Sequence, residues 1–204
     1  MSDLSIELSK RIGAHRIQEL NHFDFPLLLL DVEWKGKLQV LMTNGLSDKV
    51  MNTPDSEVEN NRIELYFCLP SYWDIHDLEN ENMNWVFHWI NRLANYLKNN
   101  DTWLGHGHTM QCGAEMKSLS PTMRQNHFIL SNPILLEEVL APIEIQNQTV
   151  RFISIIPIFE DEMDYKQGKG TFKFMQKLAN KGVTEKLDDF RSTVLKSKWR
   201  LIKR

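Results

Sequence analysis

The stretch Arg62-Ile-Glu-Leu-Tyr-Phe-Cys-Leu-Pro-Ser-Tyr-Trp-Asp74 decides the fold. Its apolar and aromatic residues predict a strand around Leu65 that closes on Leu69-Pro70. Two apolar runs precede it, at residues 27–34 and 37–43, and the Lys-Gly turn signal between them predicts a hairpin. We therefore expect the strand around Leu65 to pair beside this hairpin.

Helical periodicity appears on both sides of these strands. Residues 5–22 carry a broad apolar stripe that Gly13 interrupts, which predicts a helix packed on the sheet. Residues 84–97 show the clearest helical spacing, and Trp85 and Trp89 are expected in the core. The sequence thus predicts one helix before the strands and one after them.

The second half of the chain adds strands and then helices. Residues 128–130 and 150–156 are apolar enough to be strands, and Pro157 is expected to end the pairing of the second. Glu160-Asp-Glu162 predicts a helix start, because acids are stabilised at the positive end of the helix dipole, although a metal or acid/base site is the alternative. Gly168-Lys-Gly170 indicates a turn between two helices.

These elements together predict a mixed α/β (α+β) fold in which a central mixed β-sheet is covered by helices. The length of 204 residues fits one domain over residues 1–195, followed by a basic tail at 196–204. Residues 54–61 and 74–82 are polar and are expected to form surface loops. The sequence contains no internal repeat and no long linker.

Charge is distributed unevenly along the chain. The net charge is −3, but the nine residues 196–204 hold five of the 24 basic residues and no acid, which leaves 19 basic against 27 acidic residues, or −8, for residues 1–195. An acidic body attracts a basic partner and repels nucleic acid, although it can also serve solubility alone. We expect no specific nucleic-acid binding.

The sequence also indicates the compartment. The N-terminus lacks the pattern of a secretory signal, and the apolar run at 27–30 is too short to cross a bilayer, so we expect a cytoplasmic protein without membrane insertion. Cys68 and Cys112 lack the paired spacing of a zinc site or a disulfide framework. We expect both to be buried, reduced thiols.

His106-Gly107-His108 carries the main enzymatic alternative. On a strand, alternate residues point to one face, so two imidazoles could bind zinc together with a carboxylate such as Glu115 or Glu64. This reading gives a metal-dependent hydrolase. In the structural reading, His108 instead donates a hydrogen bond that fixes the loop after Leu104, and His106 faces water.

The basic segment 196–204 permits a third reading. Its cations flank Trp199, Leu201 and Ile202, which is compatible with contact to phosphates or to a membrane surface. A solvated chain end is the alternative.

Several short motifs follow one another in an order that resembles the Suppressor-of-fused family. They include a turn before a Met, the strand that closes on Leu-Pro, a helix ending in Leu93-Ala-Asn-Tyr96, a Gly-His-Thr step and the segment 189–191. The single residues that carry the resemblance are Gly45, Ser47, Met51, Glu64, Leu69, Pro70, Trp73, Gly107, His108, Thr109, Pro157 and Gly168. The likeness covers residues 40–192.

This resemblance implies a Suppressor-of-fused-like domain that binds another protein and catalyses no reaction. Stand-alone bacterial members of the family resemble immunity proteins that neutralise a toxin by occluding it, so the expected partner is a basic toxin domain. We expect no cofactor and no metal. Aromatic residues dominate binding hot spots but more often lie in the core, and the interface candidates on this basis are Tyr66, Tyr72, Trp73, Trp103 and His108.

Overall fold

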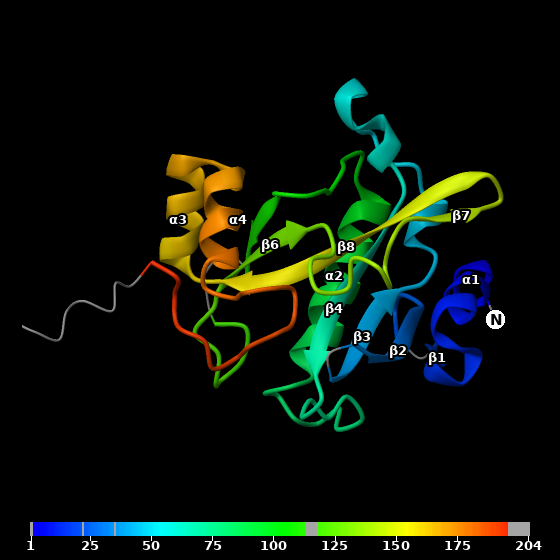
Figure 1. The fold of residues 1–204 in the computed structure, drawn as a ribbon, viewed down its shortest axis with the longest axis horizontal. Coiled ribbons are helices and arrows are strands. Elements are labelled where there is room, and N and C mark those ends of the chain that lie inside the picture. The colour runs from blue at the N-terminus through cyan, green and yellow to red at the C-terminus, as the bar shows by residue number, and fades with distance from the viewer. Residues whose placement is uncertain (1, 22, 35, 113–117, 196–204) are drawn as a thin grey trace, which may run out of the picture.

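The computed structural model describes residues 2–21, 23–34, 36–112 and 118–195. The basic segment 196–204, Lys35 of the predicted turn and Glu115 lie outside the described residues. Within these ranges, eight strands form one mixed sheet in the order β1-β2-β3-β4-β8-β6-β5, and β7 pairs with β8 (Figure 1). The strands are β1 Ile17–Leu20, β2 Leu27–Glu33, β3 Lys37–Thr43, β4 Ile63–Pro70, β5 Thr109–Gln111, β6 His127–Ser131, β7 Ile143–Ile145 and β8 Gln148–Ile158.

Strand β4 lies at the centre of this sheet, and all eight of its residues are buried. It pairs antiparallel with β3 and parallel with β8, whereas the other strand pairs are antiparallel. A strand covered on both faces needs a continuous apolar run. The predicted hairpin and the strand beside it are confirmed.

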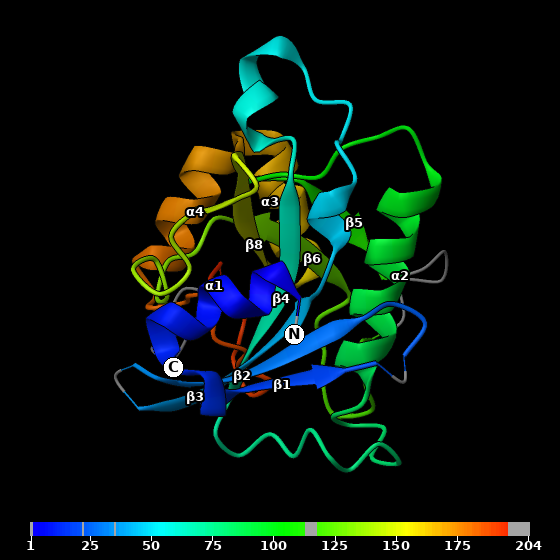
Figure 2. The same ribbon diagram turned by 90° about the vertical axis from the view of Figure 1, so that its right-hand side faces the viewer.

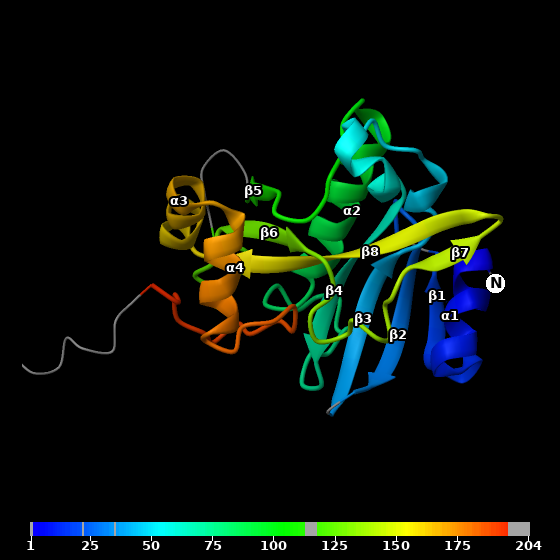
Figure 3. The same ribbon diagram turned by 45° about the horizontal axis from the view of Figure 1, so that its top comes forward.

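Helices cover both faces of the sheet. Helix α2 (Trp85–Asn99) lies on one face, and α1 (Asp3–Ile12) lies on the other (Figure 2). Helices α3 (Glu160–Lys169) and α4 (Thr171–Ala179) pack near the C-terminal end of β8, far from α1 (Figure 3). The mixed α/β architecture predicted from the sequence is confirmed.

The alternation of side chains along the strands builds two main cores. Leu65, Phe67 and Leu69 face α2, whereas Tyr66 and Cys68 face the side of α1. Trp85 and Trp89 are buried in the α2-side core, as their helical spacing predicts. A third cluster joins Ile156 and Ile158 of β8 to α3 and α4, with Phe174 fully enclosed.

The helix predicted over residues 5–22 is wrong beyond Ile12. Gly13 has a φ of +92°, which ends α1, and a short 3₁₀ helix at Ala14–Arg16 leads into β1. Residues 17–20 form β1 and pair with β2, with Ile17 opposite Leu30. The apolar residues of the short edge strand β1 continue the helical spacing of α1, so the sequence pattern of the two elements is that of one longer helix.

Two smaller expectations also need correction. Pro157 does not end the pairing of β8, because it lies opposite Phe128 of β6 and Ile158 continues the ladder. The helical break falls at Gly170 alone, since Gly168 lies inside α3. The segment 54–61 lies at the surface, as expected, and it contains the 3₁₀ helix Asp55–Asn60; a further 3₁₀ turn spans Leu46–Asp48.

Candidate functional site

A groove of about 670 Å³ lies between α2 and the edge strand β5. Its size falls in the range of ligand-binding clefts. Its lining combines aromatic and aliphatic side chains with polar ones, and α3 contributes Lys166. The lining residues are Trp89, Arg92, Leu93, Tyr96, Thr102, Trp103, Leu104, His108, Thr109, Met110, Gln111 and Lys166.

Trp103 and His108 meet in this groove. Their ring centroids are 4.2 Å apart in an edge-to-face arrangement, and both side chains are half-buried. Gly105 permits this geometry, because a Cβ there would stand 2.8 Å from the Trp103 ring. Gly107 turns the chain with a φ of +85°, and its amide donates to the carbonyl of Leu130.

Strand β5 forms the open edge of the groove. It pairs with β6 on one side, with Met110 opposite Phe128, and it ends the sheet among the described strands. The Leu130 amide donates to the carbonyl of His108, and the Cys112 amide donates to the carbonyl of Asn126. These two bonds show which residues of the β5 segment turn their backbone groups toward β6. The backbone groups of the two intervening β5 residues, 109 and 111, therefore point away from β6.

The groove lining differs in charge from the acidic body. It contains the cations Arg92 and Lys166, and the described lining includes no carboxylate. The Arg92 guanidinium lies 4.8 Å from the centroid of the Trp89 ring. Burial and the charge of Lys166 lower the pKa of His108, against an opposing effect of Glu57. The imidazole is therefore neutral at neutral pH.

The structure does not bring His106 and His108 together as alternate residues of a strand. Residues 106 and 107 form a turn that precedes β5, and His106 is exposed while its Nδ1 accepts the amide of Asn132. His108 packs against Trp103, and among the described residues its side chain makes no hydrogen bond to the loop after Leu104. In the described ranges no group of three or more His, Cys, Asp or Glu side chains is placed to hold a metal. Glu64, one of the expected carboxylate ligands, is fully buried under another loop.

Two of the interface candidates lie in the core. Tyr66 is 0% exposed, and its hydroxyl donates to Glu185 over 3.5 Å. Trp73 is 3% exposed and donates from its indole to the carbonyl of Met83. Neither ring reaches the surface, because β4 is enclosed on both faces and Trp73 packs edge-on against Trp85.

Tyr72 belongs to a second surface, which the sequence reasoning did not separate from the first. It is 50% exposed, donates to Asp189, and lies 6.4 Å from the ring of Phe190, which is 80% exposed. Tyr72 and Phe190 line a hollow of about 690 Å³ along the segment 181–194. The five candidates are therefore split between the core, this hollow and the groove beside β5.

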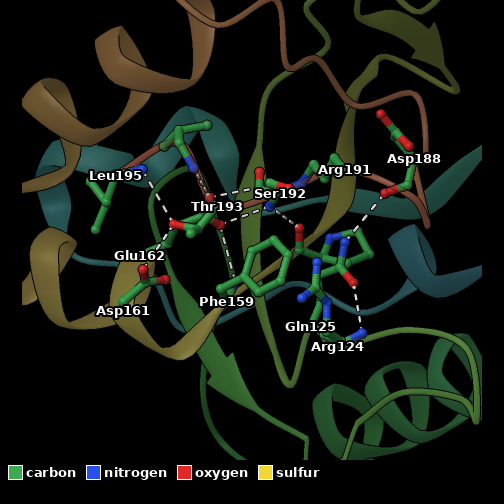
Figure 4. A network of polar contacts seen from close by, with 12 residues as sticks. Arg124, Gln125, Phe159, Asp161, Glu162, Asp188, Arg191, Ser192, Thr193 and Leu195 are labelled. Carbon is green, nitrogen blue, oxygen red and sulfur yellow. Dashed lines mark hydrogen bonds and ion pairs between the residues drawn. The ribbon is translucent and has the colours of Figure 1, made fainter. Parts of the chain in front are cut away.

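A network of hydrogen bonds and an ion pair links residues 191–195 to α3 (Figure 4). Arg191 donates to both oxygens of Glu162 and to the carbonyl of Pro157, and it lies over the ring of Phe159. Glu162 also accepts the amides of Phe159 and Val194. The predicted role of the acids at this helix start holds for Glu162, which in addition serves as the anchor for residues 191–195.

Most of the motif residues lie in or beside loops, and buried side chains or backbone groups fix these loops by hydrogen bonds. Glu64 accepts the amides of Gly45 and Ser47 and the Ser47 hydroxyl, and the Sδ of Met51 accepts the amide of Leu104. Gly107 and His108 lead from the turn into β5, which begins at Thr109, and the Pro70 carbonyl at the end of β4 accepts the amide of Trp73. Pro157 and Gly168 are exceptions, since Pro157 lies within β8 and Gly168 lies inside α3 with nothing within 4 Å of a Cβ placed there.

Glu185 is a buried group that the sequence analysis missed. Its carboxylate accepts the amides of Ile134, Leu135 and Leu136, and its side chain is enclosed. The nearby thiol of Cys68 is free and buried, and burial raises its pKa well above the usual value. The local sequence gives no signal for Glu185, because its partners lie about 50 residues earlier.

The fold and the groove define a mixed-sheet protein with an aromatic cleft beside one open edge. The family model described as Suppressor of fused protein (SUFU) matches residues 27–192, and the chain belongs to this family. No curated protein sequence matches the chain. Among the described helices none is long and apolar enough to span a bilayer.

Solved structures show the same fold at low sequence identity. The Sufu protein of a Sufu–Fu complex has a TM-score of 0.64 and 14% identity over 94% of this chain and 90% of the other. A suppressor of fused homologue from Neisseria gonorrhoeae has a TM-score of 0.63 and 14% identity over 95% and 96%. Drosophila Suppressor of Fused has a TM-score of 0.59 and 16% identity over 83% of this chain and 42% of that protein.

Proposed function

We propose that this protein is a non-catalytic protein-binding domain that holds one partner in the groove between α2 and β5. The observation that carries the proposal is the pairing of Trp103 and His108 in an aromatic cleft at an open sheet edge. Partly exposed aromatic side chains that line a concave surface supply much of the binding energy in protein interfaces. The Sufu–Fu complex supports the class, because there a protein of the same fold is bound to another protein.

The edge strand suggests how the partner is held. Backbone groups of Thr109 and Gln111 point away from β6 and can pair with an extended segment, while the cleft receives alternate side chains of that segment. Tyr96 is 46% exposed at the rim of the cleft and presents a further aromatic contact. Main-chain pairing supplies affinity, and the fit to the cleft supplies specificity.

We further propose that the protein acts in the cytoplasm as an immunity protein that occludes a basic toxin domain. The charge of −8 over residues 1–195 supports this role, because an acidic body speeds the encounter with a basic protein. Arg92 and Lys166 make the groove itself cationic. The electrostatic attraction of a basic partner therefore comes from the surface outside the groove. The groove then binds a segment of that partner.

Co-expression with the product of the neighbouring gene tests this function. We expect a complex that survives purification and suppresses that product's toxicity. The variant Trp103→Ala should weaken binding at least tenfold, since removal of a hot-spot aromatic costs 2 kcal/mol or more by the usual scale. Tyr72→Ala at the separate hollow is the matched control and should bind as the wild type does.

The salt dependence of association tests the charge argument separately. We expect the association rate to fall as ionic strength rises, with little change in the dissociation rate. An association rate that is indifferent to salt, or an acidic partner, would refute steering but leave the groove assignment intact.

A further inference from the structure

The carboxylate of Glu64 is attached to one short loop by an unusual number of donors. Glu64 lies on β4 and is 0% exposed. Within the described part of the chain, no cation donates to its oxygens. Every donor comes from the end of β3 or the loop after it, namely the Thr43 hydroxyl, the amides of Gly45, Leu46 and Ser47, and the Ser47 hydroxyl.

The surroundings of Glu64 favour a carboxyl group that changes its proton occupancy near neutral pH. Burial raises its pKa to about 7, while the hydrogen bonds from Thr43, Ser47 and Gly45 oppose that rise. Arg62 lies nearby, but its guanidinium donates to the carbonyls of Ser47 and Asp48. Other charged groups nearby include Asp3 of α1, Asp48 and Lys49 of the loop, and Arg151 of β8, which contacts Glu59. Further along α1, Glu7 pairs with Lys10, and Arg11 donates to backbone carbonyls of residues 139–142.

The same loop continues to the far side of the sheet and reaches α2. The Nζ of Lys49 donates to the carbonyls of Leu97, Lys98 and Asn100 over 2.6, 3.1 and 2.7 Å. These carbonyls belong to the end of α2, where the last carbonyl groups lack partners within the helix. A cation there is also stabilised by the helix dipole. Lys49 therefore fixes the end of α2.

Met51 connects the loop to the second wall of the groove. Its amide donates to the carbonyl of Asn61, and its Sδ accepts the amide of Leu104 over 3.5 Å. Leu104 and the preceding Trp103 line the groove, as do Leu93 and Tyr96 on the last turns of α2. Residues 45–51, which we name the anchor loop, thus run from Glu64 to both sides of the groove.

We propose that Glu64 is a remote positioning residue for the groove, which acts by holding the anchor loop so that Lys49 and Met51 fix the end of α2 and the segment 103–104. The importance of Glu64 for partner binding rests on the proposed function. Its effect on the anchor loop and the groove is a property of the free protein. An ionised carboxylate holds amide donors more strongly than a neutral one. Burial outweighs this gain, since it raises the pKa of Glu64, and opening of the loop to water therefore becomes easier as the carboxyl group ionises.

Amide hydrogen exchange of the free chain, followed by mass spectrometry, tests the proposal without a partner. In Glu64→Gln we expect residues 45–47 to exchange at least tenfold faster, together with Leu104 and the end of α2, while β2 and β6 keep their rates. Wild-type protection of these segments should decrease between pH 6 and pH 8 after correction for intrinsic rates, because opening that exposes Glu64 to water is favoured once its carboxyl group ionises. The glutamine variant should lose this pH dependence.

A matched variant separates transmission from local loosening. Lys49→Met removes the contact to α2 but leaves Glu64 and its donors, so the end of α2 should exchange faster while residues 45–47 do not. If Glu64→Gln fails to fold, Thr43→Val can replace it, because it removes one donor to Glu64. Exchange should then become faster in the same segments, but by a smaller factor. Faster exchange confined to residues 45–47, or a wild-type pattern in Lys49→Met, overturns the proposal.

Partner binding distinguishes this proposal from the proposed function. If both hold, Glu64→Gln binds the partner at least threefold more weakly than the wild type. If the exchange pattern appears but Trp103→Ala binds normally, Glu64 still positions the cleft and the proposed function fails. If Trp103→Ala loses binding while the exchange pattern is absent, the positioning proposal fails alone.

Discussion

Arg191 and Glu162 form a buried ion pair in which Arg191 donates two hydrogen bonds, of 2.7 and 2.8 Å, to the two carboxylate oxygens. The side chains are 7% and 0% exposed. This pair joins the C-terminal segment to the first turn of α3, and the Pro157 carbonyl accepts from the same guanidinium. The position of residues 191–195 therefore depends on a contact between positions 29 residues apart.

Arg191→Met should destabilise the protein by about 3 kcal/mol, because removal of one partner leaves a buried charge without compensation. The free energy of unfolding in urea measures this loss. The double variant Arg191→Met with Glu162→Gln should recover part of it, since the charge is then absent.

Arg16→Ala is the control for that experiment. Arg16 pairs with Glu33 at the surface, where the side chains are 34% and 66% exposed. An exposed pair contributes less than about 1 kcal/mol. Equal losses in the two variants would show that burial does not determine the strength of the Arg191 contact.

Glu64 should make stability depend on pH. Its pKa is raised by burial to about 7 from an ordinary value of 4.5, so the folded state binds the proton more tightly than the unfolded state. The stabilisation is complete below pH 4.5 and is lost as pH rises through about 7. It amounts to about 3 kcal/mol. The difference in unfolding free energy between wild type and Glu64→Gln should therefore change in this window.

The comparison with Glu64→Gln cancels the other titrating groups, which both proteins share. A constant difference from pH 4 to pH 8 would mean that the carboxyl group has the same pKa in both states.

Gly107→Ala and Gly168→Ala should have opposite effects. At Gly107 the φ of +85° disfavours a side chain, and a Cβ would stand 2.8 Å from Cγ2 of Thr171. We expect a loss of about 2 kcal/mol there. Gly168 lies inside α3 with open space around it, so alanine should stabilise the protein by about 0.5–1 kcal/mol. Thermal unfolding of both variants measures the contrast, and a stabilising Gly107→Ala would contradict the assigned turn.

Periodicity made the main elements predictable. The apolar run of β4 and the helical spacing of Trp85 and Trp89 each correspond to burial in the structure, because hydrophobic pattern reports local environment. The same reasoning failed at residues 13–20, where the short strand β1 could not be distinguished from a continued helical stripe. The φ of +92° at Gly13 is what ends the helix.

The site was less predictable than the fold, because its parts come from distant segments. Trp103 and His108 were recognised as candidates, but their proximity depends on the turn at Gly107 and on the edge position of β5. Tyr66 and Trp73 have the same residue types and are buried. Sequence type alone cannot separate an aromatic in a groove from one in a core.

The most direct test of the groove assignment is amide hydrogen exchange in the complex with the product of the neighbouring gene. The account predicts that residues 109–111 and 96–104 become at least tenfold more protected, since β5 gains a strand partner and the cleft is filled. The segment 181–194 beside Tyr72 and Phe190 should keep its rates. Protection of that segment with unchanged exchange at residues 109–111 would contradict the account.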